Sequence, residues 1–406
     1  MTNPNNLSAR AIQTTGRYLV LLPRGQANAG IMSLRNSTGT SEIDDSAVSN
    51  IGVAVVALDP DQLQSLNAAV AGPEPILAAE PEQIMYAIAT SAIGTVAPEQ
   101  QLTTAAFSDG ATTWGLQATK VFSSQYTGAG VKVAVLDTGL DLNHPDFSGR
   151  NITHTSFITG ESVQDLQGHG THCIGTSCGP LSPPDPSSPM RYGVAHNAEI
   201  FVGKVLSNEG SGADGGILAG IDWAISNGCQ IISMSLGAPT RLGTPYSPIY
   251  EEVAKRALSQ GTLIIAAAGN ESSRPGFSNP VGRPANCPSI MAVAALDGQL
   301  QIAAFSNSSM NPEGGGIDIT GPGVAVYSTW STDALTVSPP NGLGPSRYQT
   351  IAGTSMATPH VAGIAALYAE ATGTRGMELW AVLMQNAQRL PLPSVDVGIG
   401  LVQAPV

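Results

Sequence analysis

The sequence predicts an α/β fold: a doubly wound, mostly parallel sheet with helices on both faces, preceded by a small α+β domain. Short apolar runs with few polar positions recur from residue 131 onward, as expected for strands that are buried on both faces. Helical stretches separate these runs, which is typical of a parallel sheet with helical crossovers. The 46 glycines, the 29 prolines and a charged fraction of only 12% also indicate many tight turns.

The predicted strands of the larger sheet are five apolar runs, at residues 131–137, 200–206, 231–237, 263–270 and 290–296. Helices are expected between them, at residues 217–226 and 251–259. Asp137 and Asn270 each end one of the predicted strands. Because ligands of such sheets bind at the carboxyl ends of the strands, both residues are candidates for a functional site.

The N-terminal part of the chain predicts a separate and smaller unit. Residues 18–90 form the predicted α+β domain, residues 1–17 precede it as a tail, residues 91–113 form a polar linker, and residues 114–406 form the larger domain. Within the small domain we expect strands at residues 18–22, 52–58 and 76–79 and a helix at residues 61–69.

Composition and charge restrict the partners of the chain. Its net charge is −13, and its 17 basic residues are scattered, which argues against nucleic acid or a membrane surface as a partner. No apolar run reaches the length of a membrane span, and the first 17 residues lack the apolar core of a signal peptide. The chain as written is therefore expected to be cytoplasmic, and it would be secreted if a signal has been removed.

The four cysteines do not suggest a disulfide scaffold, and their spacing shows no paired metal-ligand motif. They are Cys173, Cys178, Cys229 and Cys287. We expect all four to be buried and reduced.

Ser355 is the candidate nucleophile. It lies in the segment Gly-Thr-Ser-Met-Ala-Thr-Pro-His, where small residues lead into an apolar helical run over residues 361–371. A serine at a helix start lies where backbone N–H groups favour negative charge, and Pro359 is expected in the first turn of that helix. A serine that merely caps a helix is the alternative interpretation of this motif.

His169 and Asp137 are the candidate partners of that serine. His169 begins a helical stretch and is flanked by Gly168 and Gly170, which allow close backbone approach. Paired with His172 it could instead ligate a metal, although the spacing is not that of a known two-histidine zinc motif. Asp137 could equally be a turn residue. A serine hydroxyl needs a base and a group that orients the base, and these two residues would supply both.

Four motifs together resemble those of the subtilisin-like serine proteases, from about residue 114 to the C-terminus. They are the Asp, His, Asn and Ser motifs, at residues 135–139, 168–173, 266–270 and 353–363, in the family's order. The resemblance implies that Ser355 is the nucleophile and that His169 is the general base. It also implies that Asp137 orients the histidine, and that Asn270 and the Ser355 N–H stabilise the oxyanion.

The resemblance also implies where substrate binds. Segments similar to the walls of the primary specificity pocket and to a substrate-pairing edge strand contribute Ser235, Leu236, Gly237, Ala268, Gly269, Ser211 and Gly212. Because Gly237 and Gly269 leave this pocket open, a large side chain should fit. Glu271 follows Asn270 and would lie at the pocket rim or be a solvated surface charge.

Two departures from the family pattern are expected to matter. The segment 179–191, where many relatives place a calcium loop, is proline-rich and offers only Asp185 as a carboxylate, so calcium is doubtful there. No cofactor is expected to be required. The segment 332–347 looks longer than usual and is expected to border the cleft.

Residues 18–90 resemble the family's propeptide, which acts as a chaperone and inhibitor. The match depends on residues 17–20, on the helix start at residues 59–62 and on residues 80–83. The expected function is a serine endopeptidase that works through an acyl-enzyme intermediate, acts on protein or peptide substrates and cuts its own propeptide off between residues 87 and 114. The propeptide would then remain as an intramolecular inhibitor.

Two other protein classes share some of these sequence features. An aspartic protease would need a second Asp-Thr-Gly or Asp-Ser-Gly besides the one at Asp137, and the sequence contains none. A non-catalytic relative used as a binding module would normally have lost a catalytic residue, whereas all four candidates are present.

Overall fold

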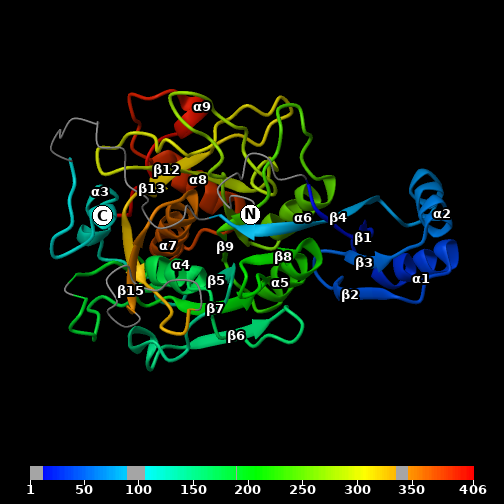
Figure 1. Cartoon of the computed structure of the whole chain (residues 1–406), viewed down its shortest axis with the longest axis horizontal. Helices are drawn as coiled ribbons and strands as arrows, with labels where there is room; N and C mark the ends of the chain where they lie inside the picture. The colour runs from blue at the N-terminus through cyan, green and yellow to red at the C-terminus, as the bar shows by residue number, and fades with distance from the viewer. Residues whose placement is uncertain (1–11, 89–105, 189, 335–345) are drawn as a thin grey trace, which may run out of the picture.

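A computed structural model describes residues 12–88, 106–188, 190–334 and 346–406 (Figure 1). It contains a large parallel sheet covered by helices and a smaller antiparallel sheet formed by the first part of the chain. The predicted tail falls mostly outside the described residues, as do residues 91–105 of the predicted linker and residues 335–345 of the long segment before Ser355.

The large sheet has the strand order β13-β12-β11-β9-β5-β7-β6, and its neighbouring strands are parallel. Its strands are β5 (Lys132–Asp137), β6 (Ile152–Ser156), β7 (Glu199–Lys204), β9 (Ile231–Met234), β11 (Leu263–Ala267), β12 (Met291–Leu296) and β13 (Ile319–Pro322). After β5 the chain forms the edge strand β6, returns to β7 beside β5, and then continues with β9 on the other side of β5, so a topological switch point lies beside that strand. The predicted fold class is confirmed.

Helices cover both faces of this sheet. Successive residues of β5 point to opposite faces of the sheet. Val133 and Val135 belong to the core under α4 (His169–Cys178) and α7 (Thr354–Thr372). Ala134 and Leu136 belong to the core under α5 (Asp214–Ser226) and α6 (Pro248–Ser259). Near-continuous apolar strands are needed because both faces are buried.

Shorter elements complete the large unit. They are the helices α3 (Trp114–Ala118), α8 (Gly376–Asn386) and α9 (Ser394–Val397), the 3₁₀ turns Val121–Ser123 and Pro145–Phe147, and the hairpin of β14 (Val326–Thr329) and β15 (Tyr348–Ile351).

Among the described residues, no helix is both long enough and apolar enough to cross a membrane. All four cysteines are buried and free, as expected.

The small sheet has the order β4-β1-β3-β2, with antiparallel neighbours, and two helices pack against it. Its elements are β1 (Thr14–Leu21), α1 (Ala27–Thr38), β2 (Ile43–Ala47), β3 (Val53–Ala57), α2 (Pro60–Ala71) and β4 (Ala78–Ala87). The sequence did not indicate α1, which has Gly, Ser, Asn and Thr among its twelve residues, or β2, which is largely polar. Helix α2 begins where expected because Asp59 and Gln62 form a capping box.

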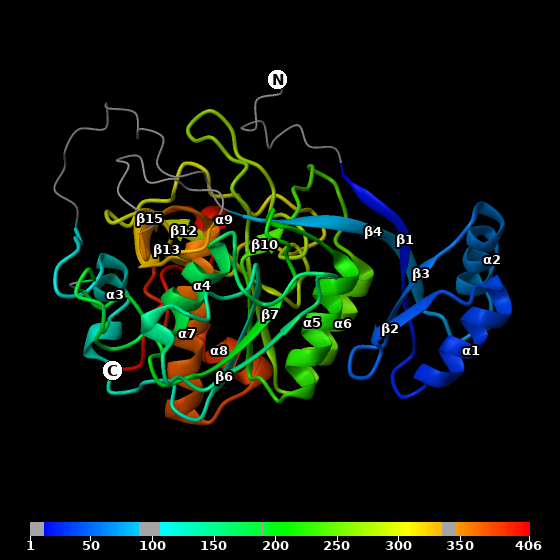
Figure 2. The same cartoon turned by 60° about the horizontal axis from the view of Figure 1, so that its bottom comes forward.

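Strand β4 connects the two units. It was predicted to end at residue 79, but it continues to Ala87 and leaves its own sheet. Its last residues pair antiparallel with β8 (Ser211–Ala213) on one side and with β10 (Leu236–Gly237) on the other. Figure 2 shows β4 extending from the small unit across the large one. The end of this strand therefore lies between the segments predicted to bind substrate.

Candidate active site

The first functional pair joins the end of a strand to the start of a helix. Asp137 is the last residue of β5, and His169 is the first residue of α4. The His169 Nδ1 and Asp137 Oδ1 atoms lie 2.8 Å apart, and both side chains are buried. Since a carboxylate only accepts hydrogen bonds, Nδ1 carries the proton, and Nε2 is left as the basic nitrogen. The predicted roles of the two residues require this tautomer.

A hydrogen-bond network that the sequence analysis missed holds this pair in place. The Asp165 carboxylate accepts from the N–H groups of Gly168 (2.8 Å) and Thr171 (2.9 Å), at the start of α4. The Thr138 hydroxyl donates to Asp165 (3.0 Å) and accepts from the Gly170 N–H (2.8 Å). The N-cap of α4 is Gly168, which makes no side-chain cap, so Asp165, three residues earlier, gives no ordinary capping signal in the sequence.

Ser355 is the second residue of α7, as its motif predicted, but Pro359 lies inside this helix rather than in its first turn. That expectation was wrong. Because proline has no N–H, it cannot bond the carbonyl of Ser355 four residues earlier. This carbonyl instead accepts from the Ser235 hydroxyl at 2.8 Å and faces the Cys173 thiol at 3.6 Å. The proline thus leaves the Ser355 carbonyl free to be bound by two neighbouring segments.

The carbonyl of Ile88 lies against the nucleophile. The Ser355 hydroxyl donates to the Ile88 oxygen, and Asn270 Nδ2 donates to the same oxygen at 3.1 Å. His169 Nε2 has no hydrogen-bond partner among the described residues. The Ser355 hydroxyl is thus directed at the Ile88 oxygen and does not donate to His169 Nε2. Ile88 immediately follows β4, so the end of this strand brings a backbone carbonyl to Ser355 and Asn270.

Asn270 is oriented by the start of the serine helix. Its Oδ1 accepts from both the N–H and the hydroxyl of Thr354, each at 2.9 Å. The Thr354 hydroxyl in turn accepts from the Gly269 N–H at 3.2 Å. Because Oδ1 is occupied in this way, the Nδ2 donor is directed at Ile88. Thr354 was not among the predicted site residues, although it precedes Ser355 in the motif.

The predicted substrate-binding segments surround the end of β4. Ser211 pairs with Tyr86, and Gly212 pairs with Met85. On the other side, Leu236 pairs with Ala87 and Gly237 with Tyr86, and the Ile88 N–H donates to the Ser235 carbonyl at 3.2 Å. The end of β4 is therefore the middle strand of three, with β8 on one side and β10 on the other.

The pocket beside Ile88 depends on a glycine. A Cβ atom on Gly237 would lie 2.9 Å from the Ile88 Cδ1 atom, so any larger residue there would compete with the bound side chain. The Ile88 side chain is 8% exposed. Neighbouring Ala268 is also buried, and Gly269 has a φ of +111°, where a side chain would be strained.

Glu271 is not a solvated surface charge, which was one of its two predicted states. Its Oε2 accepts from Asn307 Nδ2 at 2.6 Å, and burial raises the pKa of its carboxyl group. A Cβ atom on Gly269 would lie 2.6 Å from this Oε2, so Glu271 lies directly beside the glycine predicted to form the pocket wall. Asn307, which fixes the carboxylate, was not predicted.

The two histidines of the His motif have different surroundings. Burial alone lowers the pKa of His169, but the Asp137 charge, the neighbouring Cys173 and the Asp137 hydrogen bond hold it well above 6.5. For His172, burial and the proximity of His169 lower the pKa to about 3. The two rings therefore do not act as a ligand pair, because His172 Nε2 faces the backbone carbonyl of Val326 at 3.1 Å.

Cys173 adds a thiol that the sequence analysis did not associate with the site. Its Sγ lies 3.9 Å from His169 Nδ1, and ligand atoms of Asp137, His169 and Cys173 lie within 4.8 Å of one another. Burial raises the pKa of this thiol, so it is neutral near pH 7. The shorter contact of Nδ1 is with Asp137 Oδ1, at 2.8 Å, so the carboxylate and not the sulfur accepts the Nδ1 proton.

A titration of the histidines tests these assignments. In the full chain carrying Ser355→Ala, the His169 ring should titrate above pH 6.5, whereas His172 should stay neutral down to its pKa of about 3. Because the folded-state pKa of His169 is raised, its protonation stabilises the fold at low pH. That contribution is lost as the pH rises through the folded-state value. NMR of the imidazole ring resonances as a function of pH measures the pKa values of both histidines.

Asp137→Asn is the matched variant for this titration. It removes the negative charge but keeps the shape, so the pKa of His169 should fall. A His169 ring that titrates below pH 6.5 in the parent chain would contradict the described geometry.

The segment expected to lack calcium is held by other contacts. The Asp185 carboxylate accepts from the Ser187 N–H at 2.9 Å and pairs with Arg347 at 2.6 Å. These hydrogen bonds lower the pKa of Asp185 to about 2. A carboxylate that already pairs with a guanidinium group does not fit a calcium site, which needs several free oxygen ligands.

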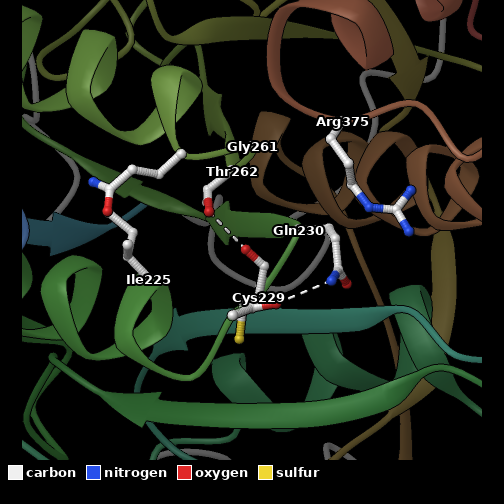
Figure 3. Close-up of a pocket in the computed structure, with 8 residues that line it drawn as sticks. Ile225, Cys229, Gln230, Gly261, Thr262 and Arg375 are labelled. Carbon is white, nitrogen blue, oxygen red and sulfur yellow. Dashed lines mark hydrogen bonds between the residues drawn. The ribbon is translucent and has the colours of Figure 1, made fainter.

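A separate cavity lies at the opposite edge of the large sheet. It has a volume of about 230 Å³ and is lined by Ile225, Cys229, Gln230, Gln260, Thr262 and Arg375, among others (Figure 3). Several of these residues immediately precede β9 or β11, whereas Asp137 ends β5 and Asn270 follows the other end of β11. The cavity is therefore not part of the candidate active site.

Together, the fold and this site define a class: serine hydrolases whose aspartate, histidine and serine come from the end of a strand and the starts of two helices in a parallel α/β fold. Comparisons with known proteins are consistent with this class. Residues 128–401 match the model of the Subtilase family, and the chain belongs to this family. The predicted resemblance is thus confirmed.

Several curated relatives are similar to this chain. Subtilisin E of Bacillus subtilis (strain 168) is 41% identical over 254 residues, which cover 62% of this chain and 58% of the relative. Subtilisin DY of Bacillus licheniformis is 38% identical over 253 residues, covering 62% and 81%. An alkaline protease of Alkalihalobacillus alcalophilus is 38% identical over 299 residues, covering 72% and 68%. The match to Subtilisin E thus spans less than two thirds of that protein.

Proposed function

We propose that this protein is a serine endopeptidase that cleaves peptide bonds through an acyl-enzyme intermediate. One observation carries the proposal. The carbonyl of Ile88 is bound by Asn270 Nδ2 and the Ser355 hydroxyl, at the end of a strand held between Ser211–Ala213 and Leu236–Gly237. A peptide in this position is a substrate whose reacting carbonyl lies beside the nucleophile.

The proposed steps assign one role to each residue. His169 Nε2 takes the Ser355 proton as the oxygen attacks the carbonyl, while Asp137 holds the Nδ1 proton and stabilises the imidazolium. The oxyanion receives hydrogen bonds from Asn270 Nδ2 and the Ser355 N–H. His169 then protonates the leaving amine, and a water deprotonated by His169 releases the acyl group. These steps need no metal or cofactor.

We also propose that the chain is a zymogen whose N-terminal unit is its propeptide and inhibitor. The buried position of Ile88 and the antiparallel pairing of β4 support this, because the unit fills the cleft as a substrate does. The bond after Ile88 is the proposed cleavage site, at the start of the window of residues 87–114. Ala89 lies outside the described residues.

Self-processing at this bond is the test of the proposal. Wild-type protein should yield two fragments, and N-terminal sequencing of the larger one should begin Ala89-Thr90-Ser91. Ile88→Asp should slow the cut about 100-fold or more, since it places a carboxylate in an apolar pocket. Time courses on denaturing gels measure the rate of the cut in each chain, and intact-mass measurement identifies the fragments.

Leu77→Asp is the matched control, because Leu77 is in the same unit but its side chain is 52% exposed. It should be cut at the wild-type rate. A larger fragment that begins elsewhere, or equal processing of the Ile88→Asp chain, would contradict the proposed site.

The substrate class and the working compartment are also part of this proposal. Substrates are proteins or peptides with an apolar residue before the cleaved bond, because the pocket holds Ile88. A reducing compartment is proposed as the working location, since four free cysteines are present.

A further inference from the structure

Lys204 is a buried lysine at the carboxyl end of the large sheet, beside the aspartate of the candidate triad. It is the last residue of β7, and it is paired in register with Asp137, the last residue of the neighbouring strand β5 (Figure 1). Its side chain is fully buried, and it takes no part in the proposed chemical steps. Because a buried charge is costly unless it is paired and hydrogen-bonded, the contacts of its ammonium group indicate what it does.

Three acceptors from three different segments surround this ammonium group. Nζ donates to the Thr138 carbonyl at 2.5 Å and to Asn208 Oδ1 at 2.9 Å, and Glu161 Oε2 lies 3.3 Å away. Asn208 Oδ1 also accepts from the Leu166 N–H at 3.2 Å. An ammonium group has three donors, so these acceptors can satisfy all of them. Lys204 therefore connects the turn after β5 with the segment before α4 and the segment before β8.

The turn that Lys204 binds determines the position of the triad aspartate. The Thr138 N–H donates to Asp137 Oδ1 at 2.7 Å, and the same oxygen accepts the His169 Nδ1 proton. Asp137 Oδ2 has no hydrogen-bond partner among the described residues, so the orientation of the carboxylate depends on the two bonds to Oδ1. The Thr138 hydroxyl also donates to Asp165, which binds the start of α4. A shift of Thr138 would therefore displace both the carboxylate and the histidine.

We propose that Lys204 is a positioning residue of the triad, which fixes the Asp137 carboxylate against His169 Nδ1 by binding the Thr138 carbonyl. This inference rests on the proposed function, because the triad must act in hydrolysis for its displacement to lower turnover. Lys204 acts through Thr138 and touches neither the Ser355 hydroxyl nor the carbonyl beside it. A charged donor suits this task, since charge-assisted hydrogen bonds are shorter and stronger than those between neutral groups.

Lys204→Met tests the proposal, because methionine keeps an unbranched apolar side chain but has no donor. The processed chain should show a kcat about 10- to 100-fold below wild type with KM within about 2-fold, since a base displaced by about 1 Å can cost about 100-fold in rate. Active sites are counted with a fluorophosphonate probe, so that unfolded molecules do not lower the measured kcat.

Lys132→Met is the matched control. Lys132 is the first residue of β5, at the end of the strand opposite Asp137, and its Nζ also donates to a carbonyl, that of Asn227, at 2.9 Å. This variant should retain the kcat of wild type. A decrease confined to KM in Lys204→Met, or an equal loss of kcat in the two lysine variants, would overturn the positioning role.

A double-mutant comparison tests whether Lys204 acts through the aspartate. In a chain that carries Asp137→Ala, adding Lys204→Met should slow self-cutting by less than about 2-fold, because the carboxylate that it positions is already absent. In the parent chain the same substitution should slow self-cutting about 10- to 100-fold, as it does kcat. Intact-mass measurement over time gives the first-order rate constants. Equal factors in the two backgrounds would show a general loss of structure and overturn the proposal.

An NMR measurement separates this inference from the proposed function. In the uncut Ser355→Ala chain, the His169 Nδ1 proton should give a downfield signal, because Asp137 accepts it at 2.8 Å. Adding Lys204→Met should make this proton exchange with water at least about 10-fold faster, whereas Lys132→Met should leave its exchange unchanged. This result does not require activity, so it remains informative if the wild-type chain hydrolyses no peptide.

Asn208→Ala is the second variant, for the case in which Lys204→Met does not fold. Asn208 is half-buried, and its loss removes one of the acceptors that hold the ammonium group. It should accelerate exchange of the His169 Nδ1 proton and lower kcat in the same direction as Lys204→Met, by about 3- to 10-fold. Exchange and kcat equal to those of the parent chains in every folded variant of Lys204 and Asn208 would overturn the positioning role.

Discussion

Replacement of Ser355 by alanine is expected to abolish both peptide hydrolysis and self-processing while leaving the fold intact. The change removes one hydroxyl group that lies against a bound carbonyl, and it creates no large cavity, so stability should change little. Turnover should fall by about 10⁶-fold, the size expected when the nucleophile of a triad acting as a unit is lost. The purified chain should remain a single polypeptide.

Steady-state hydrolysis of a short peptide and intact-mass measurement together test this result. Ser306→Ala is the matched control, because Ser306 is equally buried but donates to no bound peptide: its hydroxyl accepts from the Ala295 N–H. That variant should process itself. A Ser355→Ala preparation that is free of other proteases and still cuts itself would contradict the assignment.

Asn270→Ala should lower kcat about 100- to 1000-fold with little change in KM. The Nδ2 donor binds the carbonyl oxygen at 3.1 Å, and its hydrogen bond strengthens when that oxygen becomes an oxyanion. Losing a contact that forms chiefly in the transition state affects turnover rather than substrate binding. Self-processing should slow by a similar factor.

Asn270→Asp separates loss of the donor from loss of packing. Aspartate can still accept from Thr354, but it has no N–H to donate and its charge repels the oxyanion, so kcat should fall at least as far. Asn386→Ala, at an exposed position of α8, should have no effect. A decrease confined to KM in the Asn270 variants would contradict the oxyanion role.

Much of the large sheet could be predicted because its strands are locally distinctive. Strands buried on both faces are apolar at nearly every position, so β5, β9 and β12 are visible in the sequence without knowledge of their neighbours. The same is not true of β4. Its second half is held by pairing with β8 and β10, which lie far away in the sequence. Propensity alone could not reveal that extension.

In the candidate site, too, some residues could be predicted from the sequence and others could not. Short motifs pointed to Ser355, His169 and Asp137, because the chemistry of a triad needs particular residue types in particular local settings. The supporting contacts could not be predicted in this way. Asp165 and Thr354 orient the site through hydrogen bonds across segments, and the effect of Pro359 depends on the distant Ser235 hydroxyl. Such contacts require the folded arrangement.

Covalent labelling with a fluorophosphonate probe tests the central claim most directly. The processed wild-type protein should react at a single serine, and mass spectrometry of the digested product should place the label on Ser355. Prior incubation with a peptide substrate should slow the labelling, and His169→Ala should prevent it, because the hydroxyl then lacks its base. A label on any other serine, or equal labelling of the Ser355→Ala chain, would contradict the account.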